Sequence, residues 1–177
     1  MTATLTLTRA TRETLPLVHA LWTDAYRFME ANGIKQWVPE QVTLEAVTYA
    51  FERSEMFLVQ CGRDVVGTFF LIRSDPIVWK GDDPPDAAYL HRLAVDRRRA
   101  GEGIGRRILE SAESYLRERR IARFRLDCAG DNAKLNEFYR GAGFAYRGRT
   151  EGNGWSASLY EKVLISENTL KCGREVD

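Results

Sequence analysis

One stretch, residues 93–116, constrains the fold of this 177-residue chain more than any other. It begins with apolar residues typical of a strand end, passes through three arginines at 97–99, and continues through glycines at 101, 103 and 105. Apolar side chains then recur at three- and four-residue steps, which predicts an amphipathic helix with one buried stripe: Ile104, Ile108, Leu109, Ala112, Tyr115 and Leu116. A strand that enters a helix through a glycine turn directs several unpaired backbone N–H groups to one place. An anion, usually a phosphate, binds well at such a place.

The glycine spacing argues against two common nucleotide-binding motifs. A dinucleotide fingerprint needs G-x-G-x-x-G, and Arg106 stands where the pattern would have to continue. A P-loop needs Gly-Lys followed by Ser or Thr, and Gly105 is followed by Arg106 and Arg107. A glycine-rich turn without a ligand is the alternative that the motif alone leaves open.

Composition narrows the class of protein. With 44% hydrophobic and 29% charged residues the chain suits one globular domain, and its net charge of +1 does not indicate a nucleic-acid partner. It holds no apolar run of the ~20 residues that a membrane span needs, and no signal peptide is recognised. Three widely spaced cysteines (Cys61, Cys128 and Cys172) and two histidines (His19 and His91) show neither a disulfide framework nor metal-ligand spacing. We therefore expect a cytoplasmic protein without a metal.

The rest of the chain alternates strand and helix patterns, which predicts an α/β fold with a mixed sheet. We expect one domain over residues 1–165 and a polar C-terminal tail over residues 166–177. The expected elements are a strand at Leu5–Leu7, a helix over 11–31 ended by Asn32-Gly33, a helix after Pro39 with Leu44, Val47 and Phe51 buried, a hairpin of 56–61 and 65–73, a loop at 74–86, strands at 87–95 and 122–129, a helix capped by Asp131 or Asn132 and ended by Gly141 or Gly143, and strands at 144–149 and 155–164.

Two strands carry a face assignment that matters for the site. In 87–95, simple alternation places Tyr89, His91, Leu93 and Val95 on one face. In 122–129, apolar residues alternate with arginines and an aspartate, and we expect the arginines of 117–125, like those of 97–99, to form solvated faces.

Two segments resemble the GNAT superfamily of N-acetyltransferases. LAVDRRRAGEGIGRRIL is similar to its acyl-CoA-binding segment, and NAKLNEFYRGAGF (132–144) is similar to the motif that follows. The resemblance covers roughly residues 56–164. It implies a single-domain GNAT-like fold, with a mixed, mostly antiparallel sheet flanked by helices, and acetyl-CoA or another acyl-CoA as the donor. The residues it assigns to donor binding are the strand end Leu93, Ala94 and Val95, the turn Arg98, Arg99, Ala100, Gly101, Glu102, Gly103, Ile104, Gly105 and Arg106, and Asn132, Leu135 and Phe138 in the second motif.

One part of the first segment departs from the superfamily pattern. The usual run is R-G-x-G-x-G, whereas this chain has Ala100 before the first glycine and Glu102 where a lysine or arginine is common. We expect weakened or rearranged phosphate contact there and not its loss, because the backbone amides carry much of the binding. Arg98, Arg99 and Arg106 are the expected side-chain partners of the phosphate, and a solvated basic loop is the alternative.

Acyl transfer to an amine needs a neutral nucleophile and a proton for the departing thiol. The resemblance gives Tyr139 the role of acid; the alternative is a core tyrosine beside Phe138. Tyr89 and His91 resemble the paired histidines of arylalkylamine N-acetyltransferases and are the candidate bases, although a strand histidine is also often structural. Glu40, Glu45 and Glu151 are further carboxylates that could border the acceptor.

Aromatic residues in the first two helices and the last strand pair suggest the acceptor pocket. Trp37, Tyr26 and Trp155 are the candidates, while Trp22 and Phe28 suit ordinary core packing. An aromatic pocket favours an apolar or arylalkyl amine, or a cation held over ring faces. The predicted function is acetyl transfer from acetyl-CoA to a primary amine of a small molecule or peptide by direct attack. A non-catalytic acyl-CoA-binding regulatory module is the alternative, and a homodimer is left open.

Overall fold

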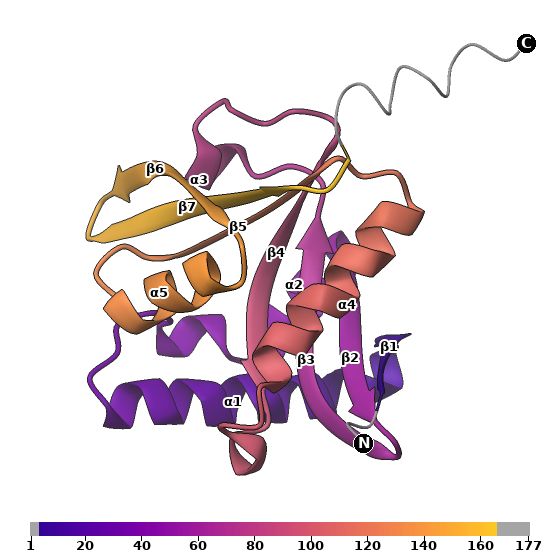
Figure 1. Cartoon of the computed structure of the whole chain (residues 1–177). Coiled ribbons are helices and arrows are strands. Elements are labelled where there is room, and N and C mark those ends of the chain that lie inside the picture. The colour runs from indigo at the N-terminus through magenta and orange to yellow at the C-terminus, as the bar shows by residue number, and fades with distance from the viewer. Residues whose placement is uncertain (1–3, 166–177) are drawn as a thin grey trace, which may run out of the picture. The chain divides into compact units, whose positions relative to one another are not determined.

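A computed structural model describes residues 4–165, so the tail expected at 166–177 lies outside the described residues. Seven strands form a sheet in the order β1-β2-β3-β4-β5-β7-β6, and Figure 1 labels the elements. The pairs β1/β2, β2/β3, β5/β7 and β6/β7 are antiparallel. This α/β arrangement of a sheet with helices confirms the predicted fold class. Among the described residues, no helix is long and apolar enough to cross a membrane.

By the density of its internal contacts the chain divides into two compact units. The first comprises the described part of Met1–Ile72 together with Leu90–Ser111, and the second comprises Arg73–Tyr89 and the described residues from Ala112 onward. β4 (Ala87–Val95) and α4 (Ile104–Glu118) each continue from one unit into the other along the chain. One domain over residues 1–165 stays a prediction, and the two units are described in turn.

The first unit begins with β1 (Leu5–Arg9), a 3-10 turn (Arg12–Thr14) and α1 (Leu15–Ala31). The helix begins at Leu15, four residues later than predicted. Pro16 explains the difference, because proline has no N–H to donate and is tolerated only in the first turn of a helix. The helix ends at the expected place, where Asn32 is followed by Gly33 with φ +66°.

Helix α2 (Leu44–Arg53) begins after the turn Pro39–Gln41, and the Thr43 side chain accepts a hydrogen bond from the Ala46 amide as its N-cap. Val47 is fully buried, as predicted, but Leu44 is 44% exposed, so its predicted burial is wrong. Leu44 is the first helical residue, and its side chain lies outside the face that packs on the sheet. α1 and α2 contribute to one apolar core with β2 (Glu55–Cys61) and β3 (Asp64–Ile72).

Strand β3 has helices on both of its faces within this unit. Phe70 lies against Trp22 of α1, with ring centroids 6.1 Å apart. A Cβ atom on Gly67, three residues earlier and on the other face, would lie 2.8 Å from the Ile108 side chain of α4 and 2.8 Å from the Ala94 carbonyl oxygen. Only glycine therefore lets β3, β4 and the start of α4 approach this closely (Figure 1).

The second unit is built on β5 (Arg123–Ala129), β7 (Trp155–Val163) and β6 (Ala145–Gly152), with α5 (Ala133–Gly141) before β6. Residues 74–86, predicted as a loop, contain the four-residue helix α3 (Pro76–Trp79), whose N-cap is Asp75. Both the Asp75 side chain and a proline at the first helical position favour this start.

Arg125 contradicts the prediction that the arginines around β5 are solvated. It is only 1% exposed, and its guanidinium donates to Glu161 on β7 (2.7 Å) and to the main-chain oxygen of Asp82 (2.6 Å). The guanidinium also lies 4.1 Å from the ring centroid of Trp79. A buried charge of this kind requires such partners. Arg125 therefore ties the 74–86 segment to β5 and β7.

Candidate functional site

The turn between β4 and α4 has the conformation that its glycines predicted. Asp96 caps a 3-10 turn (Arg97–Arg99), accepting a hydrogen bond from the Arg98 amide at 3.0 Å. Gly101 and Gly103 then adopt φ of +85° and +71°, values that β-carbon-bearing residues rarely adopt. No heavy atom lies within 4 Å of a Cβ built on either glycine, so open space faces both residues. In the first turn of α4, helix geometry leaves backbone N–H groups without a carbonyl partner within the helix.

The arginines of this turn have carboxylate or aromatic neighbours. Arg98 donates to both oxygens of Asp96, with a shortest distance of 2.7 Å, and Arg99 donates to both oxygens of Glu102, also at 2.7 Å. These bonds lower the pKa of both carboxyl groups. Arg97 lies 3.6 Å from the ring centroid of Phe28. Phe28 is 39% exposed, so its predicted core packing is wrong. The predicted phosphate partners Arg98 and Arg99 thus each hold a carboxylate of the turn itself.

Strand β4 is interrupted at Arg92, which has φ +54° in the middle of the strand. A left-handed residue breaks the alternation of side chains, as in a β-bulge. Tyr89, His91, Leu93 and Val95 therefore do not form the single regular face that was predicted, and the burial pattern changes across this point, with Tyr89 buried and His91 half-buried. Such strain in a non-glycine residue is concentrated at functional sites.

The side chains at this interruption lie on the aromatic cluster of the first unit. His91 stacks on Phe70 with centroids 5.4 Å apart and planes 18° from parallel. The Arg92 guanidinium lies 4.8 Å from the Trp37 ring centroid and 5.7 Å from that of Trp22. The two indoles are themselves 6.3 Å apart. Trp22 is 2% exposed, which confirms its predicted core position.

Tyr26, a predicted acceptor residue, belongs to the same partly buried layer as Trp37. Its hydroxyl donates to Glu30 on the next turn of α1 at 2.7 Å, and this bond raises its pKa. The structure therefore brings Tyr26, Trp37 and His91 into one unit together with the turn at 101–106.

In the second unit, α5 begins at one of the two caps that the sequence predicted. The Asn132 side chain accepts a hydrogen bond from the Leu135 amide at 3.1 Å, which identifies Asn132, not Asp131, as the cap. Tyr139 is 5% exposed and packs between Phe144 and Tyr160, with centroids 6.1 and 5.9 Å away. Burial raises the pKa of its hydroxyl, so Tyr139 is protonated at neutral pH.

The remaining candidates in this unit differ in exposure. Leu135 and Phe138 are half-buried on α5, and the Phe138 ring lies 5.3 Å from that of Tyr139. Trp155, at the start of β7, is 42% exposed, and its indole packs against the backbone of Gly152.

Tyr89 has the environment of a structural residue. It is fully buried, its hydroxyl donates to Asp83 at 2.6 Å, and it accepts a hydrogen bond from Arg125 at 3.3 Å. Burial and the bond to Asp83 raise its pKa. A tyrosine that keeps its proton so firmly is a poor proton acceptor, which leaves His91 as the better of the two candidate bases.

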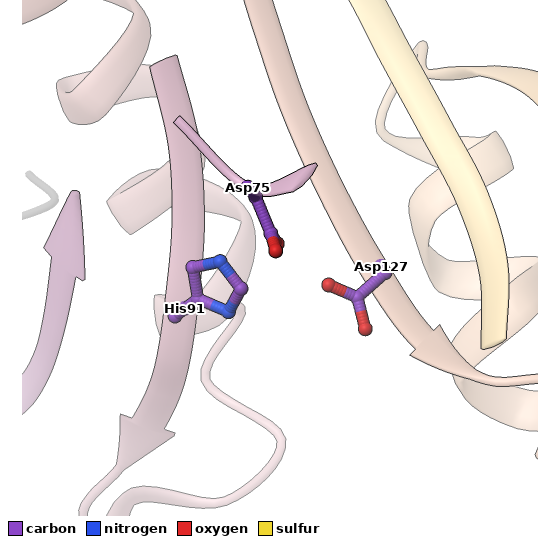
Figure 2. A group of neighbouring side chains, drawn as sticks. All are labelled: Asp75, His91 and Asp127. Atoms are coloured by element: carbon purple, nitrogen blue, oxygen red, sulfur yellow. The ribbon is translucent and has the colours of Figure 1, made fainter. Parts of the chain in front are cut away.

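Two carboxylates of the second unit form a pair that the sequence did not suggest. An oxygen of Asp75, the cap of α3, and one of Asp127, on β5, lie within 4.8 Å of each other. Figure 2 shows both carboxylates, with the imidazole of His91 projecting from β4. Asp75 is 7% exposed and Asp127 is half-buried. They are separated by more than fifty positions, and no local pattern links them.

Comparison with known proteins decides the family. The model of the acetyltransferase (GNAT) family matches residues 16–144, which span most of the chain. The chain belongs to the GNAT family of acetyltransferases. An uncharacterised N-acetyltransferase of Bacillus subtilis, YesJ, is 30% identical over 146 residues, 79% of each protein. The chain is accordingly an N-acetyltransferase enzyme.

Solved GNAT structures share its fold. An acetyltransferase from Listeria monocytogenes superposes with a TM-score of 0.74 at 24% identity, over 92% of this chain and 98% of that one. RimL, a ribosomal L7/L12 alpha-N-protein acetyltransferase in complex with coenzyme A, gives a TM-score of 0.69 at 22% identity, over 90% and 94%.

Within this GNAT chain, local signals predicted the glycine turn, and the resemblance assigned a role to Tyr139. The surroundings of four further residues were not predicted. Asp75 and Asp127 pair across sequence-distant segments, and Arg125 depends on a partner 36 positions away. Arg92 precedes the apolar strand end, and its side-chain type gives no indication of a left-handed backbone.

Proposed function

We propose that this GNAT enzyme transfers an acetyl group from acetyl-CoA to a primary amine of a small molecule or peptide. The observation that carries the proposal is the turn at 101–106. Gly101 and Gly103 hold left-handed conformations, face open space, and lead directly into α4, whose first amides have no helical partner. This arrangement fits a pyrophosphate bound by backbone N–H groups and by the helix dipole.

The strand end at Leu93, Ala94 and Val95 immediately precedes that turn and suits the pantetheine arm. Ala94 is 3% exposed, and its carbonyl faces Gly67 of β3, while Leu93 and Val95 are half-buried. Acetyl-CoA would supply an activated thioester, whose acyl carbon the amine attacks directly. The C–N bond forms, the C–S bond breaks, the amine loses a proton and the departing sulfur gains one.

We assign His91 as the general base that accepts a proton from the amine. It lies two positions before Leu93, and its ring is held by stacking on Phe70. Histidine changes charge near neutral pH and can accept a proton directly or through water. Because Arg92 interrupts the strand, the regular rise of ~3.3 Å per residue does not set the His91 position relative to Leu93.

We assign Tyr139 as the general acid that protonates the departing sulfur. Burial raises its pKa and keeps its hydroxyl protonated, which is the state that a general acid needs. The asparagine cap of α5 and the packing against Phe144 and Tyr160 fix the ring. Donor binding by Asn132, Leu135 and Phe138 is proposed from the superfamily motif.

The class of amine is the open part of the proposal. The RimL neighbour is an alpha-N-protein acetyltransferase of ribosomal L7/L12, which supports peptide amines alongside small molecules. A cytoplasmic location and a homodimer stay predictions.

A panel of primary amines, amino acids and short peptides tests the proposal, with acetyl-CoA as the donor and free CoA thiol as the readout. We expect thiol release that depends on at least one amine and an acetylated product of matching mass. Thiol release that is independent of every amine would show a hydrolase, and no release would favour the acyl-CoA-binding regulatory module.

A further inference from the structure

Helix α5 buries two residues, Asn136 and Tyr139, which lie one turn apart on the same face. Tyr139 is the proposed acid, whereas Asn136 has no role in the function proposed above. A buried amide costs free energy unless its polar atoms find hydrogen-bond partners. Asn136 is 5% exposed, so its side chain has to find these partners inside the protein.

The Asn136 side chain connects α5 to β5 and β7. Its Nδ2 donates to the main-chain oxygen of Asn132 at 2.8 Å and to that of Ala129, the last residue of β5, at 3.3 Å. Its Oδ1 accepts a hydrogen bond from the hydroxyl of Tyr160 on β7 at 2.7 Å. Tyr160 is fully buried, and burial raises the pKa of its hydroxyl, so this donor keeps its proton. A buried network whose members are satisfied in this way makes the elements that it joins rigid.

Tyr139 depends on the packing of its ring for its orientation. Burial raises the pKa of its hydroxyl, and no hydrogen bond to another described residue holds that hydroxyl. The ring packs against Phe138, Phe144 and Tyr160, with centroids 5.3, 6.1 and 5.9 Å away. Of these three rings only that of Tyr160 carries a hydroxyl, and its bond to Asn136 fixes where the ring lies.

We propose that Asn136 is a positioning residue: its bond to Tyr160 fixes the ring against which Tyr139 packs, and so directs the Tyr139 hydroxyl toward the departing sulfur. Asn136 acts through the two tyrosines and not on the reacting atoms. This inference rests on the proposed function, because it takes Tyr139 as the general acid. A misplacement of ~1 Å can cost about 10²-fold in rate, so a loosely placed ring would slow the proton transfer.

Tyr160→Phe tests the proposal, because it removes the bond to Asn136 and keeps the ring. We expect kcat to fall about ten- to hundredfold while the Kd for acetyl-CoA stays the same. Asn136→Leu breaks the same bond from the other side and leaves the Tyr160 hydroxyl its contact with Arg140. The matched control is Tyr146→Phe, which removes the hydroxyl of another ring that packs on Tyr160, 5.7 Å away, and should retain the wild-type kcat.

The double variant Asn136→Leu/Tyr160→Phe separates loss of position from loss of stability. It removes both polar partners, so neither is left unsatisfied in the core. The carbonyl oxygens of Ala129 and Asn132 keep the backbone amides of Asn132 and Asn136 as donors. The urea midpoint of the double variant should therefore lie closer to wild type than that of either single variant, while its kcat stays low. Recovery of kcat together with stability would show that the network is only structural.

A second comparison shows whether the network acts through Tyr139. In the Tyr139→Phe background, Tyr160→Phe should not lower kcat any further, because the acid that the network positions is already absent. An equal loss of kcat in both backgrounds would overturn the inference.

The outcomes separate this inference from the proposed function. If Tyr139→Phe slows transfer but Tyr160→Phe and Asn136→Leu do not, the positioning role is overturned and the acetyltransferase proposal stands. If Tyr139→Phe turns over like wild type, the acid role and the positioning role fail together, whereas acetylation of an amine stands. If wild type acetylates no amine, the proposed function itself fails, and the inference fails with it.

Discussion

Glu102 holds the guanidinium of Arg99 with three hydrogen bonds of 2.7 to 3.0 Å on the turn that leads into α4. The carboxylate therefore occupies donors of Arg99, an expected phosphate partner that stands one residue before the arginine position of the superfamily pattern. Glu102 is 45% exposed and Arg99 30% exposed, so the pair can open toward solvent. A phosphate that binds the Nε–Nη2 edge of Arg99 has to displace this carboxylate.

Replacing Glu102 with glutamine should tighten acyl-CoA binding. An exposed ion pair contributes little, so the expected gain in affinity is at most about fivefold. Calorimetric Kd values for Glu102→Gln, Arg99→Gln and the double variant give the coupling between the two side chains. Arg99→Gln alone should weaken binding.

Glu118→Gln is the matched control, since it removes a 75%-exposed carboxylate at the far end of α4. Glu102→Gln should tighten acyl-CoA binding more than Glu118→Gln does. This difference should disappear when Arg99 is also replaced by glutamine. Weaker binding in Glu102→Gln would mean that the carboxylate positions Arg99 for the phosphate instead of competing with it.

Removing the hydroxyl of Tyr139 should slow the chemistry and spare the binding of the donor. Tyr139→Phe keeps the ring between Phe144 and Tyr160 but removes the proton, and general acid catalysis contributes ~10²–10⁴-fold. We expect kcat to fall at least tenfold with little change in the Kd for acyl-CoA. Tyr146→Phe, which changes a 50%-exposed tyrosine of the same unit, should retain full turnover. If both variants match wild type, Tyr139 is a core residue only.

Local physics explains which parts of the site could be predicted from the sequence. The turn at 101–106 was predictable because left-handed backbone conformations favour glycine, and glycines stand at 101 and 103. The Asn132 cap was likewise local. The buried pair of Arg125 and Glu161 was not, because the alternation along β5 says nothing about a partner 36 residues away. The interruption at Arg92 also has no local signal, since arginine has no preference for positive φ.

His91→Gln should remove the pH dependence that a neutral-range base confers. In wild type, kcat/KM should rise with pH through the range in which histidines lose their proton. In the variant this rise should flatten and the rate should fall, while the Kd for acyl-CoA stays the same. A variant whose pH profile overlays that of wild type would assign His91 to the aromatic cluster alone.

Asp83 should contribute pH-dependent stability to the 74–86 segment. It accepts hydrogen bonds from Ser74 and, at 2.6 Å, from Tyr89, and these bonds lower its pKa. A lowered carboxyl pKa stabilises the folded state above the ordinary aspartate value of ~3.9, and this contribution is lost as the pH falls through the folded-state pKa.

Asp83→Asn should therefore lower the free energy of unfolding by about 1–2 kcal/mol at pH 7. The difference from wild type should shrink toward zero at acid pH, below the folded-state pKa. Urea unfolding at both pH values measures it. Asp24→Asn, which removes a 61%-exposed carboxylate on α1, should have little effect at either pH. An equal loss of unfolding free energy at both pH values would show that the hydrogen bonds of Asp83 stabilise the segment independently of its charge.

The most direct test is a single-turnover measurement of acetyl transfer in wild type and Gly103→Val. Valine at φ +71° is strained and places a side chain in the open space of the turn, whereas Gly154→Val makes the same change at φ +76° in the β6–β7 turn. Acetylated amine and free CoA thiol should appear one for one in wild type and in Gly154→Val. Gly103→Val should keep its circular dichroism and form neither product. Thiol release without acetylated amine, or normal transfer in folded Gly103→Val, would contradict the proposal that this turn binds acetyl-CoA for transfer to an amine.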